Sequence, residues 1–261
     1  MDRRVGETRD VRVRLAGAVI GSALACTTVL GFGSSASASS ADDVKIAEAG
    51  TILASDLPAA YSETTSASSQ IGVEKADKSS LEGSAADIKE CKGFVEAFGG
   101  KPEGVTASAD GAQFEDEATQ VSGSVLVFQT EAQARALYKP LAKRSLATCM
   151  DKLFKKSFEE SIASGSQKVE IQKATASVKA HPVPAVGDET SDYQITLSMK
   201  AAPKNKPKQA ITVDMTGDLQ FVRAGRTLAF YNFLAVGGPL DDVQQPAVAA
   251  ATARLAAAQG G

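Results

Sequence analysis

The chain has 261 residues, of which 43% are hydrophobic, and it contains three cysteines, one histidine and no tryptophan. This apolar content is enough for one or two domains with a buried core, which excludes a wholly disordered chain. A formal net charge of -3 and the scarcity of aromatic residues argue against nucleic-acid binding, because proteins that follow a phosphate backbone normally carry a basic excess.

The first 38 residues have the three parts of a secretory signal peptide. Five arginines lie within residues 1–14, and an uncharged apolar run extends over residues 15–32. Ala36-Ser37-Ala38 then places small residues where a signal peptidase requires them. We predict cleavage after Ala38 and export of the remainder. Two alternatives stay open: the apolar run is near the length of a retained membrane anchor, and Cys26 could be lipidated.

Cleavage would leave two cysteines, Cys91 and Cys149. An even pair in an oxidising compartment predicts a disulfide bond between them. The bond would close a loop of roughly sixty residues, which in the chain-entropy model stabilises the fold by about 4 kcal/mol. The mature chain would lose a net charge of +2 and reach -5, so its charge does not favour an anionic lipid surface.

The mature chain begins with a short helical pattern. Apolar residues at helical spacing predict a helix over residues 42–54, which Asp56-Leu57-Pro58 ends. The Ser/Thr-rich segment 62–80 predicts a loop on the surface.

Two further helices are expected to carry the cysteines. Ser84 and Asp87 form an approximate capping box for the first, which presents Cys91 on its apolar side and stops at Gly99-Gly100. The second has one apolar stripe, which places Cys149 inward. That stripe consists of Leu146, Cys149, Met150, Leu153, Phe154 and Phe158. The disulfide is therefore expected to fasten two helices together.

A capped helix precedes the second cysteine helix. Thr130 and Gln133 form its capping box, and Pro140 either kinks it or begins the next segment.

Period-two alternation predicts an antiparallel sheet of about five to six strands. The strands lie near Phe114 and over residues 121–127, 169–178, 193–199, 211–221 and 227–236. The even-numbered residues of 211–221, Asp218 among them, predict a solvated face, whereas 227–236 is apolar on both sides and predicts a central strand. An Ala-rich helix from about residue 240 to 258 completes the pattern. We therefore predict one α+β domain over residues 39–261.

The chain offers few motifs for catalysis or metal binding. Its one histidine, His181, lies in a Pro-rich segment, and we expect a solvated loop residue rather than a catalytic base. The sequence has no nucleophile elbow, P-loop, dinucleotide-binding glycine pattern or EF-hand loop. We accordingly predict no catalytic residue, no cofactor and no metal site, and the ligand-binding residues stay unassigned.

Clusters of like charge are expected to be structural. The acidic clusters are Glu115-Asp116-Glu117, Glu159-Glu160, Asp188-Glu189 and Asp241-Asp242, and the basic ones are Lys152/Lys155/Lys156 and Lys200/Lys204/Lys206/Lys208. No acidic pair has a spacing that marks a glycosidase, and Asp188 suits a turn after Gly187. The lysines suit solvated surfaces, with an anionic cell-wall polymer as the alternative partner.

The order of several short motifs resembles a known family. The motifs are Asp56-Leu57-Pro58, one cysteine on each of two helical segments, Thr130-Glu-Ala-Gln-Ala-Arg-Ala, Val186-Gly-Asp-Glu-Thr and Val222-Arg-Ala-Gly-Arg-Thr-Leu. They are similar to those of actinobacterial secreted proteins and lipoproteins related to the PknH-type extracellular sensor domain. The resemblance implies an antiparallel sheet with helices, a ligand-binding groove and no known catalysis. This chain departs from the pattern in having one predicted disulfide rather than two, and no kinase.

These observations favour an exported, non-enzymatic binding module of the cell envelope or extracellular space. Its partner would be a small ligand, an apolar one included, or an envelope protein. Two alternatives stay open: a cell-envelope hydrolase that uses acidic residues, and a purely structural interaction protein.

Overall fold

The structure is a computed structural model that describes residues 41–72, 85, 87–98, 102–164, 169–203, 205, 208–238 and 240–260. The predicted signal peptide, Ser84 and Gly99-Gly100 lie outside the described residues, as do Lys204 and Lys206. Within the described part, no helix has both the length and the apolar character needed to cross a membrane.

The helical segments are α2 (Ala41–Ala49), η1 (Ala54–Asp56), η2 (Lys89–Cys91), α4 (Lys92–Phe98), α5 (Glu131–Leu141), α6 (Arg144–Ser164) and α7 (Asp241–Gly260). The strands are β1 (Ser62–Thr65), β2 (Ser68–Ile71), β3 (Val105–Asp110), β4 (Gln113–Glu115), β5 (Thr119–Phe128), β6 (Val169–His181), β7 (Glu189–Pro203), β8 (Ile211–Ala224) and β9 (Thr227–Val236).

The strands form one antiparallel sheet, which confirms the predicted α+β fold. Its order is β1-β4-β5-β9-β8-β7-β6, and β3 pairs with β5 and with β2. The described part of the chain contributes nine strands to this sheet, rather than five or six. Residues 62–71 were predicted as loop, but they supply β1 and β2, whose mostly exposed polar residues give no apolar alternation. β3 was also missed, because its buried residues are mainly small.

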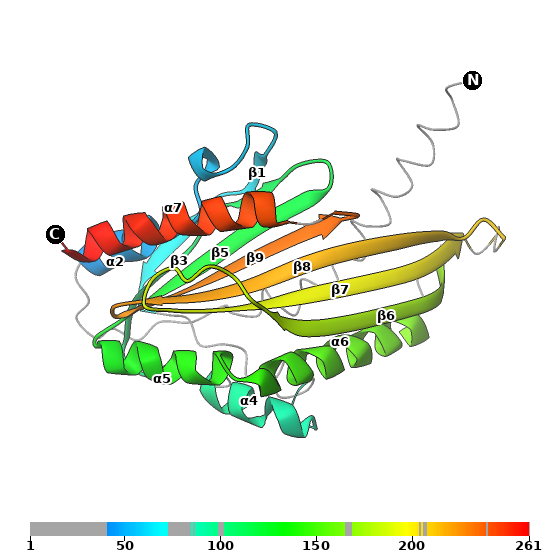
Figure 1. Ribbon diagram of the computed structural model, residues 1–261, viewed down its shortest axis with the longest axis horizontal. Coiled ribbons are helices and arrows are strands. Elements are labelled where there is room, and N and C mark those ends of the chain that lie inside the picture. Colours follow the sequence, from blue (N-terminus) through cyan, green and yellow to red (C-terminus); the bar gives the residue numbers. More distant parts are fainter. Residues whose placement is uncertain are drawn as a thin grey trace.

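Helices cover both faces of the sheet, and two apolar cores result (Figure 1). One core lies under α5 and α6, where Phe128, Leu141 and Leu228 are buried. The other lies under α2 and α7, where Tyr231 and Leu255 are buried. β9 contributes to both cores in alternation, which confirms that it is a central strand covered on both sides.

The prediction of a solvated face on β8 is correct for only part of the strand. Thr212 and Asp214 are exposed, but Asp218 and Gln220 on the same face are fully buried. The first residues extend past α7, whereas the later ones lie beneath it, with Gln244 of α7 bonded to Gln220. A local strand pattern does not reveal this cover, because α7 follows later in the chain.

Two of the predicted helices differ in their limits. The first ends at Ala49 rather than at residue 54, and Leu53, which lies within the predicted span, is 42% exposed. The first cysteine helix begins at Lys89 as a short 3-10 turn and continues as α4 from Lys92.

The capping box of α5 is confirmed. Gln133 N donates to Thr130 Oγ1 at 3.3 Å, and Thr130 N donates to Gln133 Oε1 at 3.1 Å. Pro140 lies inside the last turn of α5, and α6 begins after a short break. Tyr193 Oη of β7 donates to the carbonyls of Leu141 and Lys143, which fixes this break onto the sheet.

The disulfide joins Cys91 of η2 to Cys149 of α6, as predicted. Their Cα atoms are 4.8 Å apart, and both residues are fully buried in the core under α5 and α6. Lys152 Nζ and Glu90 Oε1, 2.7 Å apart, join the same two elements at the surface. The bond therefore attaches the η2–α4 segment to the long helix that packs on β6.

Candidate functional site

Five polar residues meet beneath the first turns of α7. They are His181, Asp192, Asp218, Gln220 and Gln244, and we call them the polar cluster. The side chains of Asp192 and Asp218 are 0% exposed, whereas that of His181 is 26% exposed. The cluster therefore has its two acids inside and its histidine toward solvent.

Strand register builds the cluster. His181 of β6 stands opposite Asp192 of β7, and Asp192 stands opposite Gln220 of β8. Asp218 comes two residues before Gln220, so its side chain points to the same face of the sheet. Residues directly opposite in an antiparallel pair have Cβ atoms about 5 Å apart. Three adjacent strands therefore present one row of polar side chains to the face that α7 covers.

The distances within the cluster are those of direct interaction. His181 Nδ1 is 3.0 Å from Asp192 Oδ2 and 3.8 Å from Asp218 Oδ1. Gln244 Nε2 donates to Asp192 Oδ1 at 3.0 Å and to Gln220 Oε1 at 3.2 Å. Gln244 thus orients the Asp192 carboxylate, with one oxygen toward α7 and the other toward the imidazole.

Burial and mutual repulsion are unfavourable to two ionised carboxylates in the cluster. Burial, and then the neighbouring Asp218, raise the pKa of Asp192 to about 7, although His181 and Gln244 act in the opposite direction. Within the cluster, His181 supplies at most one positive charge against two acids. Buried charges of one sign destabilise a fold unless a proton or a cation balances them. The arrangement therefore suits binding of a positively charged species.

The position of His181 corrects the sequence interpretation. We expected a solvated loop residue, but it is the last residue of β6, partly buried and paired with Asp192. The prediction ended one strand at residue 178 and began the next at 193, so it placed neither partner on a strand. Extending the alternation by three residues on β6 and one on β7 would have revealed the pair.

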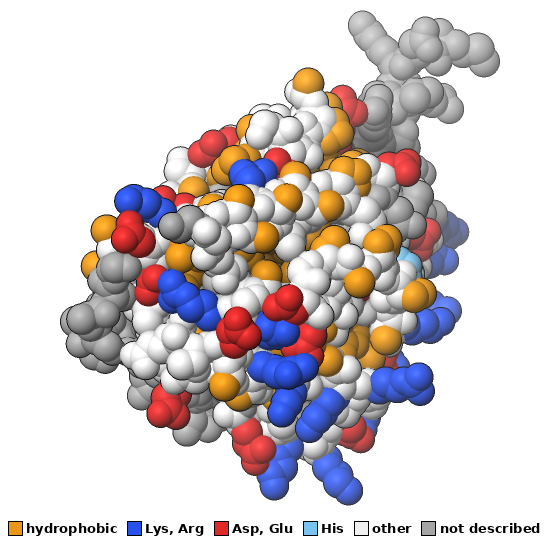
Figure 2. Space-filling model, turned by 60° about the vertical axis from the view of Figure 1, so that its left-hand side comes forward, with side chains coloured by type: hydrophobic (Ala, Val, Ile, Leu, Met, Phe, Trp, Pro, Cys, Tyr) orange, Lys and Arg blue, Asp and Glu red, His pale blue; other side chains and the backbone are white. Residues whose placement is uncertain are grey.

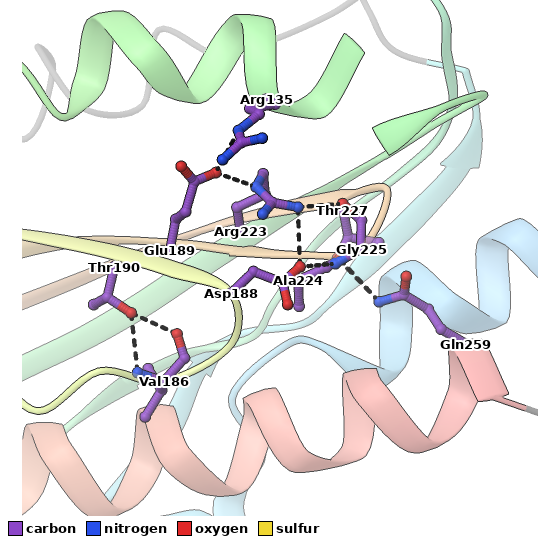
Figure 3. Close-up of polar contacts among 10 residues, drawn as sticks. All are labelled: Arg135, Val186, Asp188, Glu189, Thr190, Arg223, Ala224, Gly225, Thr227 and Gln259. Atoms are coloured by element: carbon purple, nitrogen blue, oxygen red, sulfur yellow. Dashed lines mark hydrogen bonds and ion pairs between the residues drawn. The ribbon is translucent and has the colours of Figure 1, made fainter. Parts of the chain in front are cut away.

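A second polar network surrounds Arg223, which is 8% exposed (Figure 3). Its guanidinium binds the Glu189 carboxylate, and it donates to Asp188 Oδ2 at 2.9 Å and to the Gly225 carbonyl at 3.0 Å. Gly225 N donates to the same Asp188 oxygen at 2.8 Å. Burial disfavours the Arg223 cation, but Glu189 and Asp188 outweigh this and raise its pKa.

This second network connects a turn, a hairpin and two helices. Gly187 has φ +66°, and a Cβ there would lie 2.7 Å from the Arg223 carbonyl oxygen, so the turn that presents Asp188 requires glycine. Arg135 of α5 and Gln259 of α7 join the network from the two faces of the sheet. The motifs around residues 186 and 223 therefore hold the β6–β7 connection against the β8–β9 hairpin.

The other charged clusters have local roles where they are described. Asp116 Oδ1 accepts from Ala118 N and Thr119 N, which closes the β4–β5 turn, and Asp241-Asp242 begin α7. Lys155 pairs with Asp151 along α6. Acidic and basic side chains lie intermingled on the face shown in Figure 2. The side chains of Glu159-Glu160 lie outside the described residues.

Taken together, the fold and the cluster define a single-domain α+β protein with one antiparallel sheet, covered on both faces and fastened by one disulfide. No protein-family model and no curated protein matches the sequence.

Two mycobacterial proteins are among the solved structures that are similar to it. One is the extracellular domain of PknH from Mycobacterium tuberculosis, at 11% identity and TM-score 0.39, covering 84% of this chain and 97% of that one. The other is an uncharacterised protein of Mycobacterium smegmatis, the Rv0999 ortholog, at 11% identity and TM-score 0.39, covering 82% and 98%. The first is an extracellular domain of the kind that the sequence motifs resemble.

Proposed function

We propose that the chain is an exported, sensor-like binding domain that acts without catalysis and takes its ligand at the polar cluster. Residues 1–38 would be removed and residues 39–261 would work outside the cytoplasm, free or retained in the envelope. The signal-peptide pattern and the buried Cys91–Cys149 bond support this compartment, since disulfides persist in oxidising environments.

The polar cluster is the observation that carries the binding proposal. Two acids buried side by side reduce stability, because apolar residues of similar volume would pack there at no electrostatic cost. Such a group is retained where it serves binding or chemistry, and perturbed pKa values concentrate at functional sites. The polar cluster favours a polar or cationic small ligand over an apolar one.

The same geometry speaks against a cell-envelope hydrolase at this site. A glycosidase needs two carboxyl groups that flank the scissile bond of its substrate. Both carboxylates of the cluster are 0% exposed and lie under α7, so a polymer chain has no direct contact with them. His181 is the one ionisable member of the cluster with substantial exposure.

The proposal is tested on protein made with its own leader in an actinobacterial host. We expect the protein recovered from culture fluid or envelope to begin at Ser39, as shown by its intact mass. That mass should lie 2 Da below the mass of the reduced protein, because disulfide formation removes two hydrogens. Native mass spectrometry should show a retained ligand that Asp218→Asn loses and Asp214→Asn keeps. Asp214 is the matched control, since it lies on the same face of β8 but is exposed. Unprocessed protein confined to the cytosol, or repeated recovery of ligand-free protein, would overturn the proposal.

A further inference from the structure

The polar cluster has the composition of a metal-binding site. One imidazole nitrogen and two carboxylate oxygens, from His181, Asp192 and Asp218, all lie within 4.8 Å of one another. Ligand atoms 2.0–2.2 Å from a tetrahedral ion are about 3.4 Å apart, by the geometry of known zinc sites. The distances from His181 Nδ1 to the two carboxylates, 3.0 Å and 3.8 Å, fall on either side of this value.

Charge balance gives a second argument. Two carboxylates and one neutral imidazole carry -2, which a divalent cation cancels. The buried environment that disfavours two ionised carboxylates would strengthen their attraction to such an ion. With the imidazole neutral, as metal binding requires, a monovalent cation would leave the three groups at -1.

The two amide side chains of the polar cluster provide an independent observation. Gln220 and Gln244 are both 0% exposed, and their carboxamides end at the cluster through the bonds to Gln244 Nε2. Among the described residues, Gln220 Nε2 and Gln244 Oε1 have no hydrogen-bond partner. Buried amide atoms without partners are rare in native proteins and often mark a bound water or ion. A metal ion with its own water ligands would supply partners to both atoms.

We propose that His181, Asp192 and Asp218 bind a divalent transition-metal ion such as Zn²⁺. This proposal names the class of ligand that the polar cluster takes, and it rests on the proposed function. A nitrogen ligand beside two oxygens favours Zn²⁺ over Ca²⁺ and Mg²⁺, which take oxygen ligands. Three protein ligands leave a coordination position for water or a further molecule. Gln244 acts as the second-sphere partner that orients Asp192.

The experiment is a titration of the purified mature domain after treatment with EDTA, using Zn²⁺ and then Mg²⁺ by calorimetry. We expect one Zn²⁺ per chain and binding of Mg²⁺ at least tenfold weaker. His181→Ala and Asp218→Asn should each weaken Zn²⁺ binding by at least tenfold, and Asp214→Asn should leave it unchanged. Circular dichroism tests whether the variants are folded. Asp218→Asn removes a buried charge, so we expect it to fold.

The visible absorption of bound Co²⁺ reports metal coordination directly, and a purely structural role of His181 would not affect it. Its visible absorption should report tetrahedral coordination in the wild type and in Asp214→Asn, and should be lost in His181→Ala. Zn²⁺ binding that is absent, or that survives both cluster substitutions undiminished, would overturn the metal inference. Those results would leave the proposed function standing, because a different ligand retained by host-purified protein, and lost from Asp218→Asn, would still establish it.

Discussion

Removing the disulfide should lower the free energy of unfolding by about 4 kcal/mol. Cys91 and Cys149 are 58 residues apart in the sequence, and closing a loop of this length removes about 14 cal/mol/K of entropy from the unfolded chain in the chain-entropy model. At 25 °C that entropy corresponds to about 4 kcal/mol, a large part of the 5–15 kcal/mol typical of whole domains. The C91A/C149A variant should therefore be clearly less stable than the wild type.

Urea unfolding followed by circular dichroism measures this loss. The control is the wild-type protein unfolded in the presence of dithiothreitol, which removes the cross-link but keeps the cysteine side chains. Agreement between the control and the variant would assign the loss to the cross-link, and a larger loss in the variant would reveal the packing contribution of two fully buried residues. A difference below 1 kcal/mol between oxidised and reduced wild type would refute the reasoning.

Three smaller effects are expected elsewhere. Thr130→Ala removes the cap of α5 and should lower stability by about 1 kcal/mol in the same urea assay; no change would mean that the cap is redundant. Gly187→Ala places a Cβ 2.7 Å from the Arg223 carbonyl oxygen at a residue with positive φ, and should lower the free energy of unfolding by roughly 1–3 kcal/mol. Its melting temperature should be lower than that of the control Gly93→Ala, where the added methyl has no atom within 4 Å. A hydrogen bond from the Arg226 side chain lowers the pKa of Asp43 in the folded protein. The pair therefore stabilises the fold fully above the pKa of Asp43 in the unfolded chain, about 4. This contribution is lost as the pH falls through the pKa of Asp43 in the folded protein. Asp43→Asn should therefore lessen the acid sensitivity of stability below about pH 4, and an unaltered pH profile would contradict this.

The sequence reveals those elements whose signals are local. The capping box at Thr130, the apolar stripe around Cys149 and the two-sided strand 227–236 all depend on neighbours within about ten residues, and the structure has each of them. The strands β1 and β2 give no such signal, since their exposed residues are held by pairing with β4 and β3.

The polar cluster could not be predicted in the same way. Asp218 looked solvated because strand alternation does not tell which later segment covers a face, and the covering residue, Gln244, comes 26 residues further on. Its partner His181 was placed in a loop because Pro182 and Pro184 suggest irregular structure, although β6 ends just before them. The site is therefore a product of tertiary packing among β6, β7, β8 and α7.

The order in which the sheet is assembled has a consequence for biogenesis. β5 lies in the first half of the chain, yet it pairs along its length with β9, close to the end. Until the ribosome has made residue 236, the earlier strands lack the neighbour that joins the two halves, and such long-range pairing forms slowly. The sheet of a nascent chain can therefore be completed only when synthesis is nearly finished.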